Sequence, residues 1–454
     1  MPSDNLRHGY EVTMHTGLEY QNTMVTDGKA AVSLQDLPIE LVAQVLTHVA
    51  DIETLDSLIR AWPAAYRVFE CSAVDITEAV LSSGYASGYV CGHIRVIFRI
   101  IALLRSGTLP ISSLADFQRR VIIDAMRSVS RVRSSRNGFA PDLLARETPP
   151  AVIRSLLATY RQVMSASLGC LTYYLDSFKT LEPEHPIDKG IKNPNPAWSQ
   201  DISTWQSRPQ GRKFNIRDVG PPSWTEEQRV NRAFWRLQLL YDLKRAASRG
   251  LLDWPDDSKA ALCDIVAVSR PIGEYANYWL RTRRYAYTTW AGSSDFYHAW
   301  VHDIPYAAHK PCPPEYEELI SVVDYVRAVH GQEASERLVK GEVCLAELQG
   351  PVEIYREWSL AKPGVKDWKT LIGPSVGAER HYRGPQGRSI LDMVDFDPLG
   401  RYGFAFWSWE RMFAYGLATR SHSEFEDYRV TYAWESILSP EEVARAEWEM
   451  GKMT

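Results

Sequence analysis

Apolar residues recur every three to four positions from Ser33 to about Thr180, the spacing that places them on one face of an α-helix. The alternation typical of β-strands is scarce there. Between Leu181 and Pro222 the pattern is lost, and proline, asparagine, glycine and charged residues dominate. Helical spacing then returns at about Trp224. We therefore expect an all-α fold, interrupted by a long Pro-rich loop over residues 181–222.

The helix after this loop has clear start and stop signals. Ser223 and Glu226 have the S-x-x-E spacing of a capping box, in which each side chain accepts a hydrogen bond from the other residue's backbone N–H. Gly250 can end the helix in a left-handed conformation. The apolar positions on one face are Val230, Phe234, Leu237 and Tyr241. Further helices are expected over residues 271–291, 314–330 and 332–355.

Three short helices are predicted at the N-terminal end of the ordered chain. Asp36 is a good N-cap for a helix over residues 37–49, and Pro38 is tolerated in its first turn. Asp51 can cap a second helix. Pro63 ends that helix and can open a third.

The first of these helices has more apolar surface than one neighbour can cover. Its polar residues Glu40, Gln44, Thr47 and His48 form a single stripe, and the remaining positions are mostly apolar. Three helices in about 40 residues bury little area among themselves. The excess apolar surface therefore needs the rest of this chain or another protein.

The opening LxDLPxELxxxVLxHV and its continuation L-x-x-L-I-x-A-x-P-x-x-Y-x-x-F resemble an F-box, in the version common in fungal proteins. The segments WTEEQRVNRAFWRLQLLYDL and GRYGFAFWSWERM also resemble parts of fungal F-box-like proteins. The resemblance implies that the segment docks on a Skp-type adaptor, which links it to a cullin. It places this contact on Leu37, Pro38, Ile39, Leu41, Val45, Leu46, Leu55, Leu58, Ile59 and Trp62.

The resulting organisation is a disordered N-terminal segment over residues 1–32, an F-box over 33–72 and a large irregular helical domain over 73–454. We expect a non-catalytic adaptor that presents a protein target to a cullin-based ubiquitin ligase. The alternative for residues 33–69 is an ordinary helix-turn-helix within a single helical domain.

Composition changes this picture little. The chain has 454 residues, 45% of them hydrophobic and 24% charged, and a formal net charge of -5. These values are near the average for globular proteins and indicate neither a nucleic-acid nor a membrane partner. The first residues contain no apolar stretch of the kind found in signal peptides, and the six cysteines form no CxxC pair. We expect a cytoplasmic or nuclear location.

Few residue patterns indicate chemistry. His298 and His302, followed by Asp303, have helical i, i+4 spacing but lack the glutamate of a zincin motif. His309 and Cys312 are not accompanied by a second pair of a His and a Cys, which a metal site of this kind would need. We expect no catalytic residue, no cofactor and no metal site.

Aromatic residues are concentrated near the C-terminus, at Phe404, Phe406, Trp407 and Trp409. Such side chains can line a surface for a protein substrate, or they can fill a core. They also allow an alternative function, a helical enzyme or small-ligand-binding protein whose pocket is formed by these residues and His381.

Overall fold

The computed structural model describes residues 37–82, 90–125, 139–187, 210–268 without 217 and 264, 314–348, 375, 377, 390–418 without 395, and 428–453. The chain divides into two units, Met1–Pro38 and Ile39–Thr454. Only Leu37 and Pro38 are described in the first unit. The predicted disordered segment over residues 1–32 therefore lies outside the described residues.

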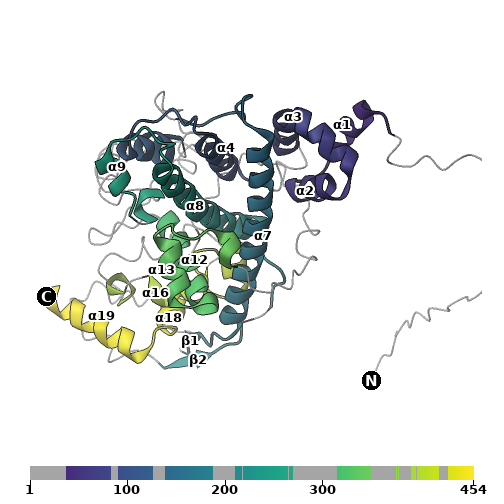
Figure 1. The fold of residues 1–454 in the computed structure, drawn as a ribbon. Helices are drawn as coiled ribbons and strands as arrows, with labels where there is room; N and C mark the ends of the chain where they lie inside the picture. Colours follow the sequence, from purple (N-terminus) through teal and green to yellow (C-terminus); the bar gives the residue numbers. More distant parts are fainter. Residues whose placement is uncertain are drawn as a thin grey trace, which may run out of the picture. The chain divides into compact units, whose positions relative to one another are not determined.

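The described part of the chain is mostly helical, which confirms the predicted all-α fold (Figure 1). Its single described sheet has two short antiparallel strands, β1 (Glu184–Pro186) and β2 (Gly211–Lys213), and Glu184 pairs with Lys213. Both strands lie within the predicted loop over residues 181–222. The sequence pattern did not predict them, because three residues are too few to show an alternation.

The second unit begins with α1 (Ile39–Thr47), α2 (Ile52–Ala61) and α3 (Pro63–Ser82). The predicted local signals are present. Asp51 caps α2 by accepting a hydrogen bond from the backbone N–H of Thr54 at 2.7 Å, and Pro63 is the first residue of α3. At Ser72 the backbone leaves the helical conformation, with φ -139° and ψ 32°, so α3 is kinked at the residue where the predicted F-box ends.

The rest of the helical unit is built around a few long helices and several short ones. The long helices are α4 (Gly92–Ser106), α7 (Pro150–Lys179), α8 (Trp224–Ser248), α12 (Pro314–His330) and α19 (Pro440–Met453). The shorter helices are α5 (Leu114–Phe117), the π-helical η3 (Gln118–Ala125), α9 (Asp256–Ala260), η6 (Ile265–Val268), α13 (Gln332–Val339), η7 (Leu345–Leu348), η8 (Ile390–Met393), α16 (Asp397–Gly400), α17 (Trp409–Ala414) and α18 (Tyr428–Glu435).

α8 lies at the centre of this unit and contacts α4, α7, α12 and α13. The predicted capping box is present, since the backbone N–H of Ser223 donates to Glu226 at 2.7 Å and that of Glu226 donates to the Ser223 hydroxyl at 3.4 Å. Gly250 has φ 68°, the left-handed conformation expected just after the helix. The one-sided pattern understated the burial, because charged residues on the other faces of α8 are buried as well.

Two buried arginines of α8 have strong polar partners, which is the condition under which charged groups are tolerated in a core. Arg232 forms an ion pair with Glu318 of α12, and both side chains are almost fully buried. Arg229 donates hydrogen bonds to the carbonyl oxygens of Phe406 and Trp407 at 2.7 and 3.1 Å. Burial lowers the pKa of Arg229 to about 10, so it remains charged at neutral pH.

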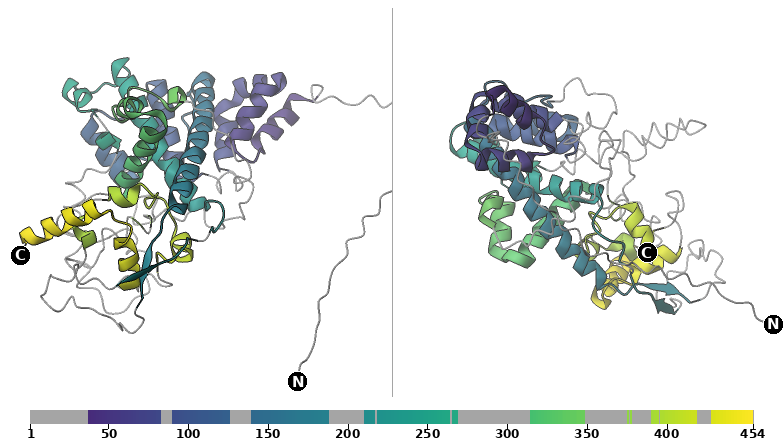
Figure 2. Two further views of the ribbon diagram at one scale, coloured as in Figure 1. Left: turned by 90° about the horizontal axis from the view of Figure 1, so that it is seen from below. Right: turned by 90° about the vertical axis from the view of Figure 1, so that its right-hand side faces the viewer.

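α7 connects the first three helices to this centre. It contacts α2 and α3 and also packs on α8. Both figures show α1, α2 and α3 together on one side of α7, with α8 on its other side (Figures 1 and 2). The predicted helix over 314–330 is confirmed as α12. The one predicted over 271–291 lies outside the described residues.

Candidate protein-docking surface on the first helices

α1 has one buried side and one exposed apolar side. Val42 and Leu46 are 1% and 0% exposed, because this side of the helix packs on α3. Leu41 and Val45 are both 43% exposed, and their i, i+4 spacing makes them neighbours along the helix. Ile39 is 60% exposed, in the first turn. We refer to Ile39, Leu41 and Val45 as the exposed α1 surface.

The expected polar stripe is present beside it. Glu40, Gln44 and His48 are exposed, and Thr47 is half-buried. Large apolar side chains with this exposure, at three positions of one short helix, differ from the isolated apolar residues found on any protein surface. The described residues of the helical unit do not cover this surface.

α2 and its C-terminal end contribute both buried and accessible residues. Leu55 and Ile59 are 0% and 3% exposed. Leu58 and Trp62 are half-buried. The helix ends at Ala61, and the backbone N–H of its C-cap residue, Trp62, donates to the carbonyl oxygen of Leu58 at 2.9 Å. Leu58 and Trp62 therefore keep part of their surface available to a partner.

The predicted set of ten adaptor contacts is thus divided by burial. In the first unit, Leu37 is half-buried and Pro38 is exposed. Five residues of the second unit keep accessible surface, namely Ile39, Leu41, Val45, Leu58 and Trp62. The predicted direct contact with the adaptor is wrong for Leu46, Leu55 and Ile59, because these side chains are enclosed by the chain itself. They hold the helices together.

Most of the C-terminal aromatic residues are not at the protein surface. Phe404, Phe406 and Trp407 are fully buried, which corrects the prediction for these three. Trp409, at the start of α17, is half-buried.

These buried rings pack against side chains from distant helices. The ring centroids of Phe406 and Tyr174 are 5.5 Å apart, those of Trp407 and Phe178 are 5.8 Å apart, and those of Phe404 and Trp434 are 4.9 Å apart. Contacts of this kind are typical of a protein core.

Gly403 is required for this arrangement. Its φ is 74°, and a Cβ at this position would lie 2.8 Å from the side chains of both Trp407 and Tyr174. Trp407 Nε1 donates a hydrogen bond to the carbonyl oxygen of Tyr402 at 2.7 Å. The aromatic run therefore fixes the packing of this part of the core.

The candidate metal ligands lie outside the described residues, and so does His381. His298, His302, Asp303, His309 and Cys312 all belong to the undescribed stretch 269–313. Within the described ranges, no group of three or more His, Cys, Asp or Glu side chains is arranged to hold a metal ion.

Within the same ranges, no helix combines the length and apolar character that crossing a bilayer requires. Comparison of the chain with protein-family models, with curated proteins and with solved structures finds no match.

Proposed function

We propose that the chain is an F-box-type adaptor, in which the first three helices bind a Skp-type subunit and the remaining helices hold a protein target. The observation that carries this proposal is the exposure of Leu41 and Val45 on the same helix that buries Val42 and Leu46. A partner that covers this surface would remove it from water, which is worth about 1.5 to 3 kcal/mol for each large apolar side chain that becomes fully buried.

The proposed activity requires no bond chemistry by this chain. An adaptor that binds a cullin-linked subunit and a target raises the effective concentration of target lysines near the ubiquitin-transfer site. The contacts between α7 and both α2 and α3 support this role, because they connect the docking helices directly to the larger helical core.

The direct test is co-purification with a recombinant Skp-type adaptor. Leu41→Asp places a charge on the exposed α1 surface, where a bound adaptor would bury it without a counter-charge, and should abolish co-purification. Val329→Asp is the matched control. Val329 is 52% exposed on α12, so the substitution introduces the same charge at an exposed apolar position of a different helix.

Circular dichroism and thermal melting of each variant show whether the fold is retained. Loss of binding in Leu41→Asp, with an unchanged melting transition and normal binding by Val329→Asp, supports the proposal. A folded wild-type chain that does not bind the adaptor, or a Leu41→Asp variant that binds it normally, contradicts the proposal.

The alternative function, a helical enzyme or small-ligand protein, gains no support from the described aromatic residues. Three of its four proposed aromatic wall residues, Phe404, Phe406 and Trp407, are buried against other rings and expose no surface to a pocket.

A further inference from the structure

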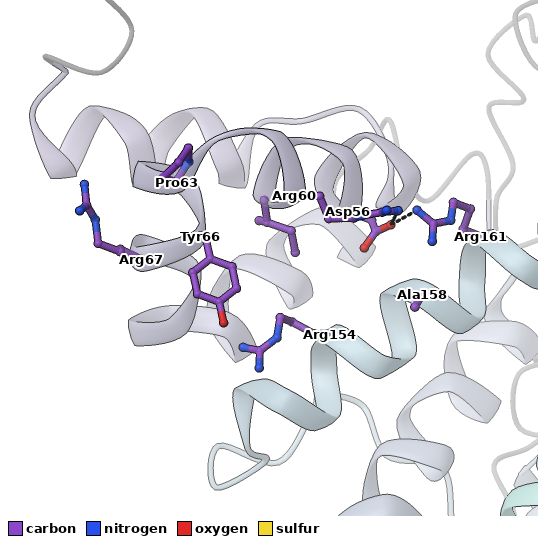
Figure 3. A pocket seen from close by; sticks show the side chains of 9 residues that line it. Asp56, Arg60, Pro63, Tyr66, Arg67, Arg154, Ala158 and Arg161 are labelled. Atoms are coloured by element: carbon purple, nitrogen blue, oxygen red, sulfur yellow. Dashed lines mark hydrogen bonds and ion pairs between the residues drawn. The ribbon is translucent and has the colours of Figure 1, made fainter.

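A pocket of about 650 Å³ lies between α2, α3 and α7 (Figure 3). Four arginines line it: Arg60 from α2, Arg67 from α3, and Arg154 and Arg161 from α7. The consecutive helices α2 and α3 and the distant α7 therefore bring four arginines to the lining of one cavity. Clustering of like charge is unfavourable unless counter-charges or an anionic ligand compensate it.

Two of these arginines are already neutralised by carboxylates of the chain. Arg161 Nη1 lies 2.9 Å from Asp56 Oδ2, and the Asp56 side chain is only 6% exposed. Arg154 forms an ion pair with Glu70, and its guanidinium carbon lies 5.2 Å from the centroid of the Tyr66 ring. These contacts also fix the α7 wall of the pocket relative to α2 and α3.

The other two arginines lack such compensation. Among the described residues, Arg60 approaches a carboxylate only at Asp56, at 3.8 Å, and its side chain is 60% exposed. Arg67 is exposed and has no ion-pair partner among the described residues. Figure 3 shows it on the same helix as Tyr66, with its side chain directed away from Arg154 and Arg161. Four arginines and two carboxylates, Asp56 and Glu70, thus lie in or beside the lining, which leaves an excess of two positive charges around the pocket.

The pocket also has space for a ligand on its α7 side. Ala158 lies between Arg154 and Arg161 on one face of α7, at i+4 from the first and i-3 from the second. Its methyl group is small, and Figure 3 shows it on α7 between the two arginines. The apolar side chains of Ile59 and Pro63 complete the lining.

We propose that this pocket binds a phosphate monoester dianion. A ligand with two negative charges matches the excess of two positive charges, because the exposed side chains of Arg60 and Arg67 can turn toward a bound anion. A single carboxylate would leave one of these charges unneutralised. The planar guanidinium fork pairs with two phosphate oxygens at once, which makes arginine well suited to phosphate recognition. The inference does not depend on adaptor binding, since it uses a different surface from the exposed α1 surface.

The test is isothermal titration of the full chain at pH 7.5, where a phosphate monoester carries close to two negative charges. Phenyl phosphate is the first probe. Phenyl sulfate has nearly the same shape but one charge, and we expect it to bind about tenfold more weakly or worse. Saturable binding of phenyl phosphate with one site per chain is the expected result.

Two variants test the pocket in independent ways. The double variant Arg60→Gln with Arg67→Gln removes the uncompensated charges and should weaken binding by about tenfold or more, since charge-assisted hydrogen bonds are lost. Ala158→Leu fills the cavity without changing charge and should weaken binding as well. Arg337→Gln, at an exposed arginine in the last turn of α13, is the matched control and should bind like the wild type.

Phosphate monoesters occur on proteins and as free small molecules, and a further titration separates these sources. A phosphoserine peptide that binds more tightly than free phosphoserine assigns the site to a modified protein side chain. Equal affinities assign it to a small phosphorylated ligand.

The proposal is overturned if phenyl phosphate shows no saturable binding up to about 10 mM, or if the double variant binds it as well as the wild type. Equal affinity for phenyl sulfate also overturns it. Co-purification with a Skp-type adaptor is measured separately on the same variants, so failure of the proposed function and failure of this inference are distinguishable.

Discussion

Asp56 on α2 accepts a hydrogen bond from Arg161 on α7 at 2.9 Å, although the two residues are 105 positions apart in sequence. Asp56 is buried, while the Arg161 side chain is 37% exposed. This pair connects the predicted F-box helices to the rest of the helical unit, and it forms one wall of the arginine-lined pocket.

Asp56→Ala should destabilise the protein by about 1 to 2 kcal/mol, because it removes a charge-assisted hydrogen bond from a largely buried group. The cost stays below that of a fully buried pair, since Arg161 can turn into solvent. Urea unfolding followed by circular dichroism measures the difference. Arg60→Ala is the control, because its 3.8 Å contact with Asp56 is long and exposed. An equal loss of stability in Asp56→Ala and Arg60→Ala would contradict a stabilising role of the Asp56–Arg161 pair.

Leu46→Ala and Leu41→Ala should have very different effects on stability, although both leucines are on α1. Leu46 is 0% exposed, so its truncation leaves a cavity and should cost about 2 to 5 kcal/mol. Leu41 is 43% exposed, and its truncation should change the free energy of unfolding by less than about 0.5 kcal/mol. Denaturant midpoints of the isolated chain provide the measurement. A large loss of stability in Leu41→Ala would mean that the chain itself covers this residue.

Glu226→Gln should be strongly destabilising. Glu226 forms a buried ion pair with Arg411 at 2.9 Å and also accepts the backbone N–H groups of Ser223 and Ser408, at 2.7 and 2.8 Å. Removing its charge leaves a buried guanidinium without its counter-ion, which costs about 3 to 5 kcal/mol.

Thermal and urea unfolding test this expectation, with Glu182→Gln as the comparison. Glu182 pairs with Lys213 at 2.6 Å, but both side chains are about two-thirds exposed, so its loss should leave the unfolding midpoint unchanged. A Glu226→Gln variant as stable as Glu182→Gln would show that the buried pair contributes nothing.

Stability should fall as the pH is lowered from about 7.5 to 5.5, in part because of His330 at the end of α12. Burial lowers the pKa of His330 in the folded state, so the unfolded chain binds a proton more readily in this range. The contribution is therefore fully present above the unfolded pKa and is lost as the pH falls through the folded one. His330→Gln should have a flatter dependence of melting temperature on pH. The same dependence of melting temperature on pH in the wild type and in His330→Gln would exclude a contribution of His330 to this pH dependence.

The sequence by itself determined the local elements. The start of α2 at Asp51, the start of α3 at Pro63 and the capping box of Ser223 with Glu226 depend on hydrogen bonds between residues a few positions apart. Such signals are complete within one short segment. The all-α class follows from the same local spacing of apolar residues.

Only the tertiary structure decided which apolar residues are accessible. Leu41 and Leu46 are the same residue type on the same helix, yet α3 covers one and leaves the other exposed. Likewise, Phe404 could have lined a surface, but rings from other helices enclose it. The arginine-lined pocket carries no sequence motif, because α7 supplies Arg154 and Arg161 from about a hundred positions later. Burial and charge clustering depend on which distant segments meet, and no local pattern contains that information.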